Sequence, residues 1–331
     1  MRYRPLGSTG IMVSEIAFGA GPVSAVMIDP SLGRACKAVA HAIQRGINWF
    51  DTAAGYGAGQ SETNLGIALQ RVADTRDVHV ATKVRLVTRD KTDLFTQVIE
   101  SFHASLARLK MSRVTLLQIH NSITAHRDDE PTSITPDDIL GPRGVLEALE
   151  NLRSNGLIDH LGLTGIGQPE ALREVIRSRR FATIQAPFHL LNPTALVAPT
   201  GAFPKPHYLG FLLDAAEMHM GIMAIRVFAG GALLDAPPSA HTLKTPFFPL
   251  ALYEHDRAVA VKLAVQLGRE VPMSQWALRF VLSHTDIATA ILGLATTDEI
   301  DAAVSVSDRG PLTETELDRL RKAINDSDAG M

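Results

Sequence analysis

Residues 47–69 read INWFDTAAGYGAGQSETNLGIAL, and their pattern carries the clearest structural signal in the chain. The run at 47–51 is mainly apolar and predicts a short strand, while the apolar positions within 61–69 predict a helix. The loop between them has glycines at three alternate positions, which favour tight turns. A strand followed at once by a helix is the repeating unit of α/β proteins with parallel sheets. The stretch therefore predicts one βα unit of such a fold.

The same alternation continues on both sides of this unit. Upstream, a strand is predicted at 15–19 and a helix at 32–45. Downstream, strands are predicted at 78–83, 114–120, 160–164, 183–187, 222–227 and 287–293. Helices are predicted at 92–109, 144–155, 169–178, 209–219, 257–268, 273–284 and 297–306. Eight βα units without an antiparallel block or a Gly/Ser linker favour an α/β fold with one (β/α)8 TIM barrel over a two-domain doubly wound sheet.

We expect a single barrel domain over residues 1–331, with an N-terminal β-hairpin and an extra C-terminal helix at 312–324. Two long irregular stretches, 121–143 and 228–256, interrupt the alternation. Both follow strand ends, so we expect them on the carboxyl face, where barrel enzymes place their active sites. Loops of this length are usually functional lids or disordered segments. The polar residues at 126–130 either hydrogen-bond a ligand or form solvated surface.

Composition limits the classes of function. Apolar residues make up 46% and charged residues 20% of the 331, which is typical of a globular protein. A net charge of −3 gives no electrostatic footprint for a nucleic acid or an anionic membrane. One cysteine, Cys36, excludes an intramolecular disulfide and a multi-cysteine zinc site. The amino terminus lacks the apolar core of a signal peptide, and no stretch reaches the roughly 18 apolar residues of a membrane helix. We therefore expect a cytoplasmic protein.

Three consecutive predicted strands end in polar residues, namely Asp51, Lys83 and His120. A lone buried Asp or Lys costs several kcal/mol, so these groups either pair with one another or face the open end of the barrel. Tyr56 lies five residues after Asp51, in the glycine-rich loop, which can aim its phenol over the barrel mouth. Taken singly, Asp51 also fits a helix cap, Lys83 and His120 fit rim positions, and Tyr56 fits a loop anchor. Together they predict a converging catalytic group.

Residues 50–66, FDTAAGYGAGQSETNLG, resemble the signature of the aldo/keto reductase family. Further matches are ATKV at 81–84, LLQIH at 116–120 and IQAPFHLL at 184–191, so the resemblance runs through most of the chain. It implies a nicotinamide cofactor across the carboxyl face and no required metal. It also implies catalytic roles for Asp51, Tyr56, Lys83 and His120, the four polar residues described above.

The expected chemistry follows from the residue types. Hydride transfer between a carbinol carbon and nicotinamide leaves a proton to be moved on the oxygen, and the phenol of Tyr56 can move it. A free tyrosine titrates near pH 10, so the ammonium of Lys83 is needed to favour the phenolate. Asp51 would hold Lys83 charged and in place. His120 would orient the substrate oxygen and polarise it through a hydrogen bond.

The resemblance also assigns cofactor contacts. Gln185 is expected to hold the nicotinamide carboxamide, the alternative being a rim glutamine. The family's usual Ser-Asn pair is replaced by Thr164 and Gly165, so one hydroxyl contact remains and the amide contact is lost. Arg226 stands where an aromatic residue often stacks on the nicotinamide, and a guanidinium can stack as well. Phe228 is the alternative for that place.

The last predicted βα loop resembles the segment that holds the adenosine end of the cofactor, with Gly293, Thr297, Asp298 and Glu299 as expected contacts. The stretch 294–303 has no basic residue, and the carboxylates of Asp298 and Glu299 oppose a 2′-phosphate but can accept hydrogen bonds from ribose hydroxyls. NAD is therefore predicted, with NADP as the alternative. The two acidic residues also fit the first turn of a helix, where they complement the helix dipole.

An NAD preference suits oxidation, and GLTGI at 162–166 is similar to the branch of the family that contains NAD-dependent aldose and L-galactose dehydrogenases. The predicted function is the oxidation of an aldose or similar sugar hydroxyl, with Tyr56 as general base. The alternatives are an NADPH-dependent aldehyde or ketone reductase and a non-catalytic, cofactor-sensing regulatory subunit. The expected partner is a small carbonyl or sugar molecule, with no nucleic acid or membrane. The sequence predicts no oligomeric state.

Overall fold

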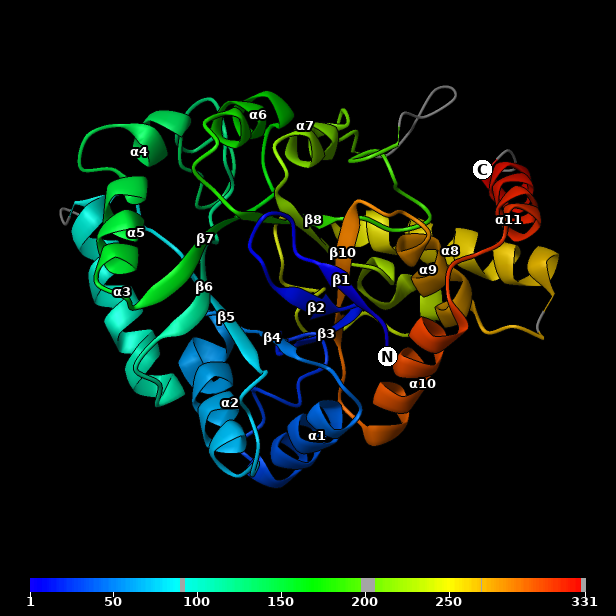
Figure 1. Ribbon diagram of the computed structural model, residues 1–331. Coiled ribbons are helices and arrows are strands. Elements are labelled where there is room, and N and C mark those ends of the chain that lie inside the picture. Colours follow the sequence, from blue (N-terminus) through cyan, green and yellow to red (C-terminus); the bar gives the residue numbers. More distant parts are fainter. Residues whose placement is uncertain (90–92, 198–205, 269, 329–331) are drawn as a thin grey trace.

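The computed structural model describes residues 1–89, 93–197, 206–268 and 270–328. Its centre is a closed barrel of eight parallel strands, in the order β10-β3-β4-β5-β6-β7-β8-β9. Figure 1 looks onto the barrel end that is crossed by the N-terminal hairpin, with the helices arranged around the strands. The barrel strands are β3 (Ile16–Gly19), β4 (Trp49–Asp51), β5 (His79–Val84), β6 (Val114–Ile119), β7 (Ile158–Thr164), β8 (Thr183–Pro187), β9 (Gly221–Ile225) and β10 (Ile287–Gly293). The predicted (β/α)8 fold is confirmed.

The barrel interior is filled by side chains and closed at its amino end by the hairpin. Strands β1 (Tyr3–Pro5) and β2 (Met12–Ser14) form this antiparallel hairpin, as predicted. Leu6, in its turn, is fully buried and packs with inward residues such as Trp49 and Met223. A Cβ on Gly221 would lie 2.6 Å from a methyl carbon of Leu6, so only glycine fits there. The hairpin thus forms the floor of the barrel.

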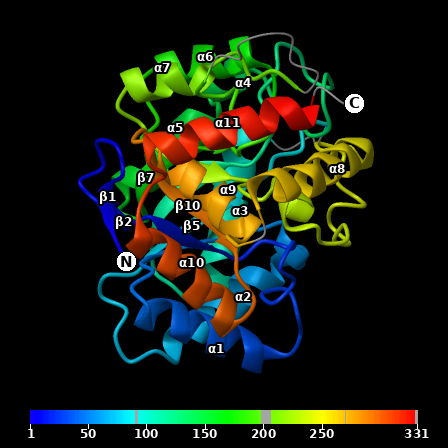
Figure 2. The ribbon, with the colours of Figure 1, turned by 90° about the vertical axis from the view of Figure 1, so that its right-hand side faces the viewer.

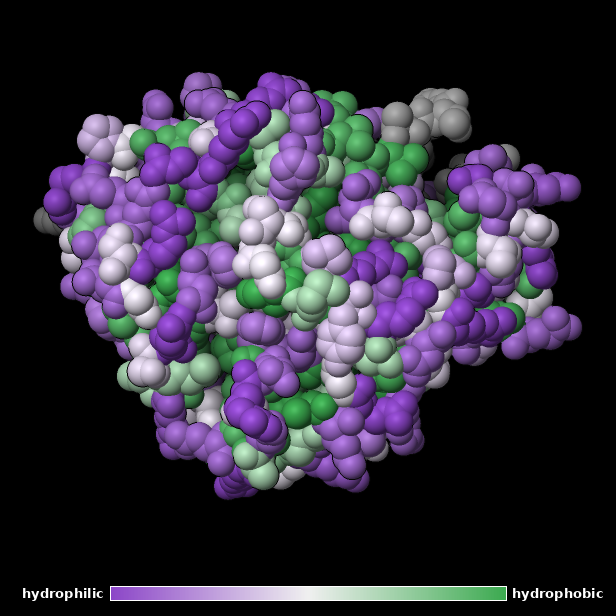
Figure 3. All heavy atoms as spheres, viewed as in Figure 1, coloured by the Kyte–Doolittle hydropathy of each residue, from purple (hydrophilic) through white to green (hydrophobic). Residues whose placement is uncertain are grey.

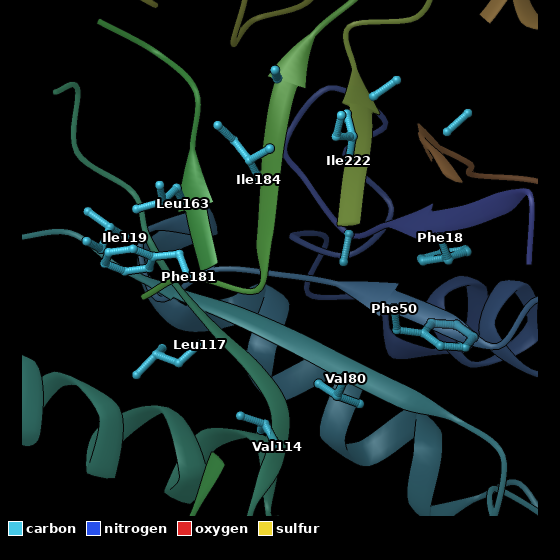
Figure 4. Packing of buried hydrophobic residues seen from close by; sticks show 14 of the residues in the cluster. Phe18, Phe50, Val80, Val114, Leu117, Ile119, Leu163, Phe181, Ile184 and Ile222 are labelled. Atoms are coloured by element: carbon cyan, nitrogen blue, oxygen red, sulfur yellow. The ribbon is translucent and has the colours of Figure 1, made fainter. Parts of the chain in front are cut away.

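The outer faces of the strands pack against the helices, as Figure 4 shows for Phe50, Val80 and Leu117. In helix α3 (Leu94–Leu109), which corresponds to the helix predicted at 92–109, Val98 and Phe102 are fully buried in this layer. The helices of the barrel layer are α1 (Leu32–Gln44), α2 (Gln60–Gln70), α3 (Leu94–Leu109), α5 (Val145–Ser154), α6 (Pro169–Arg177), α7 (Phe211–Glu217), α9 (Met273–Leu282) and α10 (Thr297–Arg309).

The two long stretches contain more regular structure than the sequence indicated. The first includes the short helix α4 (Pro136–Leu140), which begins with a capping box between Thr135 and Asp138. The second includes the 3-10 segment η2 (Ala229–Leu234), and its last seven residues belong to helix α8 (Leu250–Leu267). The irregular part therefore spans residues 235–249, which we call the lid segment.

The extra C-terminal helix is α11 (Glu314–Asp328), which is longer at its end than the predicted 312–324. It lies beside α8, as Figures 1 and 2 show, and the two helices share a hydrophobic cluster that includes Leu263 and Leu320. On the face seen in Figure 3, polar side chains cover much of the outer surface and apolar ones are interspersed. Among the described residues, no helix has the length and apolar character needed to cross a bilayer.

Candidate active site

Three neighbouring strands bring the predicted polar residues together at the carboxyl end of the barrel. Asp51 is the last residue of β4, Lys83 lies in β5, and His120 directly follows β6. Tyr56 opens the 3-10 turn η1 (Tyr56–Gly59), which leads into α2. Gly57 in this turn has φ +58°, and a Cβ there would lie 2.7 Å from the Ile28 side chain. The glycine loop therefore fixes the phenol over the mouth, as the sequence predicted.

Lys83 is the centre of this arrangement and is only 1% exposed. Its Nζ forms an ion pair with Asp51 and donates to the Thr52 carbonyl oxygen at 2.8 Å and to the Tyr56 hydroxyl at 3.4 Å. Burial disfavours the ammonium, but the negative charge of Asp51 and the nearby Tyr56 outweigh this, so the pKa of Lys83 is raised. The buried amine therefore stays charged and directs its charge at the phenol oxygen.

Asp51 is held by two amides as well as by Lys83. Its second oxygen accepts from Nε2 of Gln118 at 3.2 Å and from Nε2 of Gln185. Gln118 was missed from the sequence, although it stands two residues before His120 in LLQIH and so faces the same side of β6. Gln185 lies in the predicted strand 183–187, but the sequence did not reveal that its amide group binds Asp51.

His120 packs edge-on against Tyr56, with 5.5 Å between the ring centroids. Burial and the positive charges of Lys83, Arg85 and His241 hold the pKa of His120 well below its usual value of 6.5. The imidazole is therefore neutral at neutral pH. Within the described residues, its buried Nδ1 has no hydrogen-bond partner, which leaves that atom available to a ligand.

Thr164 ends β7 and is paired in register with Gln185 on β8. Its hydroxyl is buried and has no hydrogen-bond partner among the residues that the structure describes. A buried hydroxyl without a partner is uncommon, and a bound polar ligand would satisfy it. The next residue is Gly165, where a Cβ would lie 3.0 Å from the Phe211 ring. This close packing explains why a larger residue is not found at that position.

Arg226 follows the last residue of β9 and has a left-handed φ of +56°, which is uncommon for a residue with a side chain. Its guanidinium carbon lies 3.7 Å from the ring centre of Phe248, in the lid segment. One face of the guanidinium is therefore covered by protein. Phe228, the alternative candidate for stacking, is packed against the hydrophobic clusters instead.

The residues of the loop after β10 that were predicted to contact the cofactor have two different roles in the structure. Gly293 ends the strand, and Thr297 and Asp298 lie in the first turn of α10, with Asp298 exposed. Glu299 closes a capping box with Thr296, and its Oε2 accepts from the backbone N–H groups of Ala295 at 2.7 Å and Thr296 at 3.2 Å. The structure thus gives Glu299 the helix-end role that was the alternative interpretation, and leaves Asp298 as the exposed carboxylate.

The polar residues of the stretch 121–143 are largely engaged with one another. Arg127 forms an ion pair with Asp138, and Asp129 accepts hydrogen bonds from the His126 backbone at 3.1 Å and from the Gln168 side chain at 3.0 Å. These contacts favour the interpretation that the polar residues at 126–130 form solvated surface, and not that they bind a ligand.

Comparison with known proteins gives a consistent result. Residues 15–325 match the sequence profile of the Aldo/keto reductase family. YqkF, an uncharacterized oxidoreductase of Bacillus subtilis, is 23% identical over 97% of this chain and 96% of its own length. L-galactose dehydrogenase of Arabidopsis thaliana is 33% identical over 167 residues, which cover 50% of this chain and 49% of that protein.

Among solved structures, the glycerol dehydrogenase AKR11B4 from Gluconobacter oxydans matches with a TM-score of 0.71 and 23% sequence identity. The match covers 98% of this chain and 94% of that chain. At this identity the likeness supports the barrel fold alone.

Proposed function

The chain belongs to the aldo/keto reductase family of oxidoreductases, which use NAD(P)H, and from this we propose that it is an NAD-dependent dehydrogenase of an aldose or similar sugar hydroxyl. The observation that carries the proposal is the buried Lys83 ammonium, which is held by Asp51 and donates to the Tyr56 hydroxyl at 3.4 Å. This arrangement stabilises a phenolate at the barrel mouth, and a phenolate is what proton removal from a substrate hydroxyl requires.

Each of the four residues has a distinct part in the proposed reaction. Tyr56 accepts the hydroxyl proton of the substrate as the carbinol C–H bond breaks, and the carbon becomes a carbonyl. Lys83 stabilises the negative charge on the phenol oxygen, and Asp51 keeps Lys83 charged and fixed. His120, which is neutral, hydrogen-bonds to the substrate oxygen and orients it. In the reductive direction Tyr56 returns the proton.

The residues around the mouth fit a nicotinamide, which when bound accepts the hydride. The observation that supports this fit is the buried Thr164 hydroxyl without a protein partner in the described structure, beside Gln185. Thr164 and Gln185 would hold the carboxamide group, and the guanidinium of Arg226 would lie beside the ring. Gly293, Thr297, Asp298 and Glu299 would lie along the adenosine end.

The choice of NAD over NADP rests on charge. Residues 294–303 contain no basic side chain, and the exposed Asp298 would repel a 2′-phosphate. The partial similarity to an L-galactose dehydrogenase supports oxidation of a sugar hydroxyl.

A side-by-side titration of NADH and NADPH, followed by nicotinamide fluorescence, tests the proposal without a guessed substrate. We expect NADH to bind at least about tenfold more tightly, a difference of roughly 1.4 kcal/mol. A panel of aldoses with NAD⁺ then tests oxidation. Tighter binding of NADPH would contradict the charge argument and favour the NADPH-dependent reductase. Binding of neither cofactor would reject the proposed function.

A further inference from the structure

Arg85 lies beside the proposed reaction centre and has no part in the mechanism above. It follows the end of β5 two residues after Lys83, so both side chains leave the chain on the same side. Its guanidinium donates to the carbonyl oxygen of His120 at 3.5 Å and lies 5.9 Å from the ring centre of Phe247. The side chain remains exposed to solvent. Arg85 therefore stands at the mouth, next to two of the catalytic strand ends.

The lid segment covers this position. Phe247 contacts Arg85, and the next residue, Phe248, stacks on Arg226. Arg85 follows β5 and Arg226 follows β9, and these strands are four places apart in a closed barrel of eight. They are on opposite sides, so the two phenylalanines lie across the mouth. Arg85 therefore lies on the side of the mouth opposite Arg226, against the lid segment.

Among the described residues, no carboxylate lies within 4.0 Å of the Arg85 guanidinium, whereas Lys83 is paired with Asp51. Arg89, four residues further along the chain, is exposed and is paired with Asp128 at 3.1 Å. Arg85 thus lies beside His120 without an ion-pair partner in the part of the chain that the structure describes.

We propose that Arg85 binds an anionic group of the substrate, a carboxylate or a phosphate. A guanidinium binds both groups through paired, charge-assisted hydrogen bonds. The inference rests on the proposed function and narrows it: the substrate is a sugar acid, a sugar phosphate or a related hydroxy or oxo acid. A neutral aldose would form no such charge-assisted contact with Arg85.

Matched probes that differ in one anionic group test this inference. In the reductive direction with NADH, 4-formylbenzoate is compared with its methyl ester, and glyceraldehyde 3-phosphate with glyceraldehyde. We expect wild-type kcat/KM to be at least about tenfold higher for the charged member of one pair. The pair that shows the preference identifies the anion as carboxylate or phosphate.

In the Arg85→Gln variant, kcat/KM for the charged probe should fall at least about tenfold, mainly because KM rises. For the neutral probe, kcat/KM should stay within about twofold of the wild-type value. Arg85→Lys should restore part of the loss, because the charge remains and the paired geometry does not. Arg89→Gln removes the same charge four residues away and should match the wild type.

Equal losses for charged and neutral probes, or weaker NADH binding by Arg85→Gln, would overturn the inference and assign Arg85 to Tyr56 or to the cofactor. If the wild type turns over no probe, the proposed function fails separately. Calorimetric titration of 4-formylbenzoate and of glyceraldehyde 3-phosphate then decides the inference without catalysis. Binding of either anion that is at least about tenfold tighter in wild type than in Arg85→Gln supports it, and equal binding rejects it.

Discussion

At the scale of single residues, Asp51 is the point on which the polar network converges. It accepts hydrogen bonds from Lys83 and from the amides of Gln118 and Gln185, and it is only 3% exposed. A buried carboxylate is stable only when it is paired and hydrogen-bonded in this way. The network therefore fixes Lys83, and through it the charge that faces Tyr56.

The first prediction concerns Tyr56. The Tyr56→Phe variant keeps the ring that packs against His120 but lacks the hydroxyl, so it cannot move the proton. We expect turnover to fall by about 10³-fold or more, while NADH affinity stays within about twofold. Steady-state kinetics and fluorescence titration measure the two quantities. Wild-type turnover in this variant would remove Tyr56 from the mechanism.

The second prediction uses the pKa of His120, which lies below its unfolded value of about 6.5. Below that pH the unfolded chain binds a proton that the folded protein does not, so the free energy of unfolding falls as the pH falls. Between pH 7.5 and 5.5, the wild type should lose about 1 kcal/mol more stability than His120→Asn. Urea unfolding at both pH values measures this. The other histidines with lowered pKa are present in both proteins, so their effects cancel in the comparison.

The sequence allowed the positions of polar residues to be predicted where these residues stand at strand ends. Asp51, Lys83 and His120 could be placed because equivalent positions on adjacent parallel strands must meet. The contacts of Gln185 with Asp51 and of Arg226 with Phe248 could not be placed. They join segments far apart in the chain, and their geometry depends on side-chain packing that no local pattern encodes.

At the scale of elements, the start of α10 is stabilised by its capping box. Thr296 accepts a hydrogen bond from the Glu299 backbone at 3.2 Å. The Thr296→Ala variant should lose about 1 kcal/mol of unfolding free energy, because that N–H loses its partner. Chemical denaturation measures the loss, and Thr297→Ala, one position into the helix, is the control. A loss of similar size in the control would show that the cap is not the cause.

The first turn of α10 also contains Asp298, the residue on which the predicted preference for NAD over NADP depends. Asp298 is exposed and its charge opposes a 2′-phosphate, so Asp298→Asn should strengthen NADPH binding by about two- to fivefold, as expected for a solvent-screened charge. NADH binding should stay unchanged. Paired fluorescence titrations of wild type and variant measure both. Unchanged NADPH affinity would mean that Asp298 lies away from the phosphate position.

The bounds of a strand or helix could be predicted where the neighbouring residues or the apolar period mark them clearly. Strands β8 and β10 match the predicted 183–187 and 287–293, where the polar or Gly/Pro neighbours limit each apolar run. Helix α8 begins at Leu250, seven residues before the predicted start. Its apolar residues lie on several sides, with Val261 and Val265 exposed while Val259 is buried, so the helical period is weak in that segment.

At the scale of the whole molecule, Glu15 ties the hairpin to the barrel. It is 2% exposed and receives hydrogen bonds from Arg2, Arg4 and Ser307. Arg4 in turn donates to the carbonyl oxygens of Leu282 at 2.6 Å and Ile287 at 2.9 Å. These contacts join the first strands of the chain to the last barrel strand.

Replacing Glu15 by Gln should therefore destabilise the protein by about 2 kcal/mol, since Arg2 and Arg4 lose the counter-charge of the buried carboxylate. The active site lies at the opposite end of the barrel, so kcat should change less than twofold. Thermal unfolding and steady-state kinetics test the two parts. Asp74→Asn, which breaks an exposed ion pair with Arg76, is the control and should cost well under 1 kcal/mol.

The floor made by the hairpin also has a consequence for how the chain acquires its structure. The hairpin of β1 and β2 rests on residues 282–287, which are synthesised much later in translation. Contacts of such long sequence separation close late, because the entropy of closing the loop must be overcome first. The nascent hairpin must wait with its apolar Leu6 exposed, and a chain that stops before residue 282 lacks the carbonyl groups to which Arg4 donates.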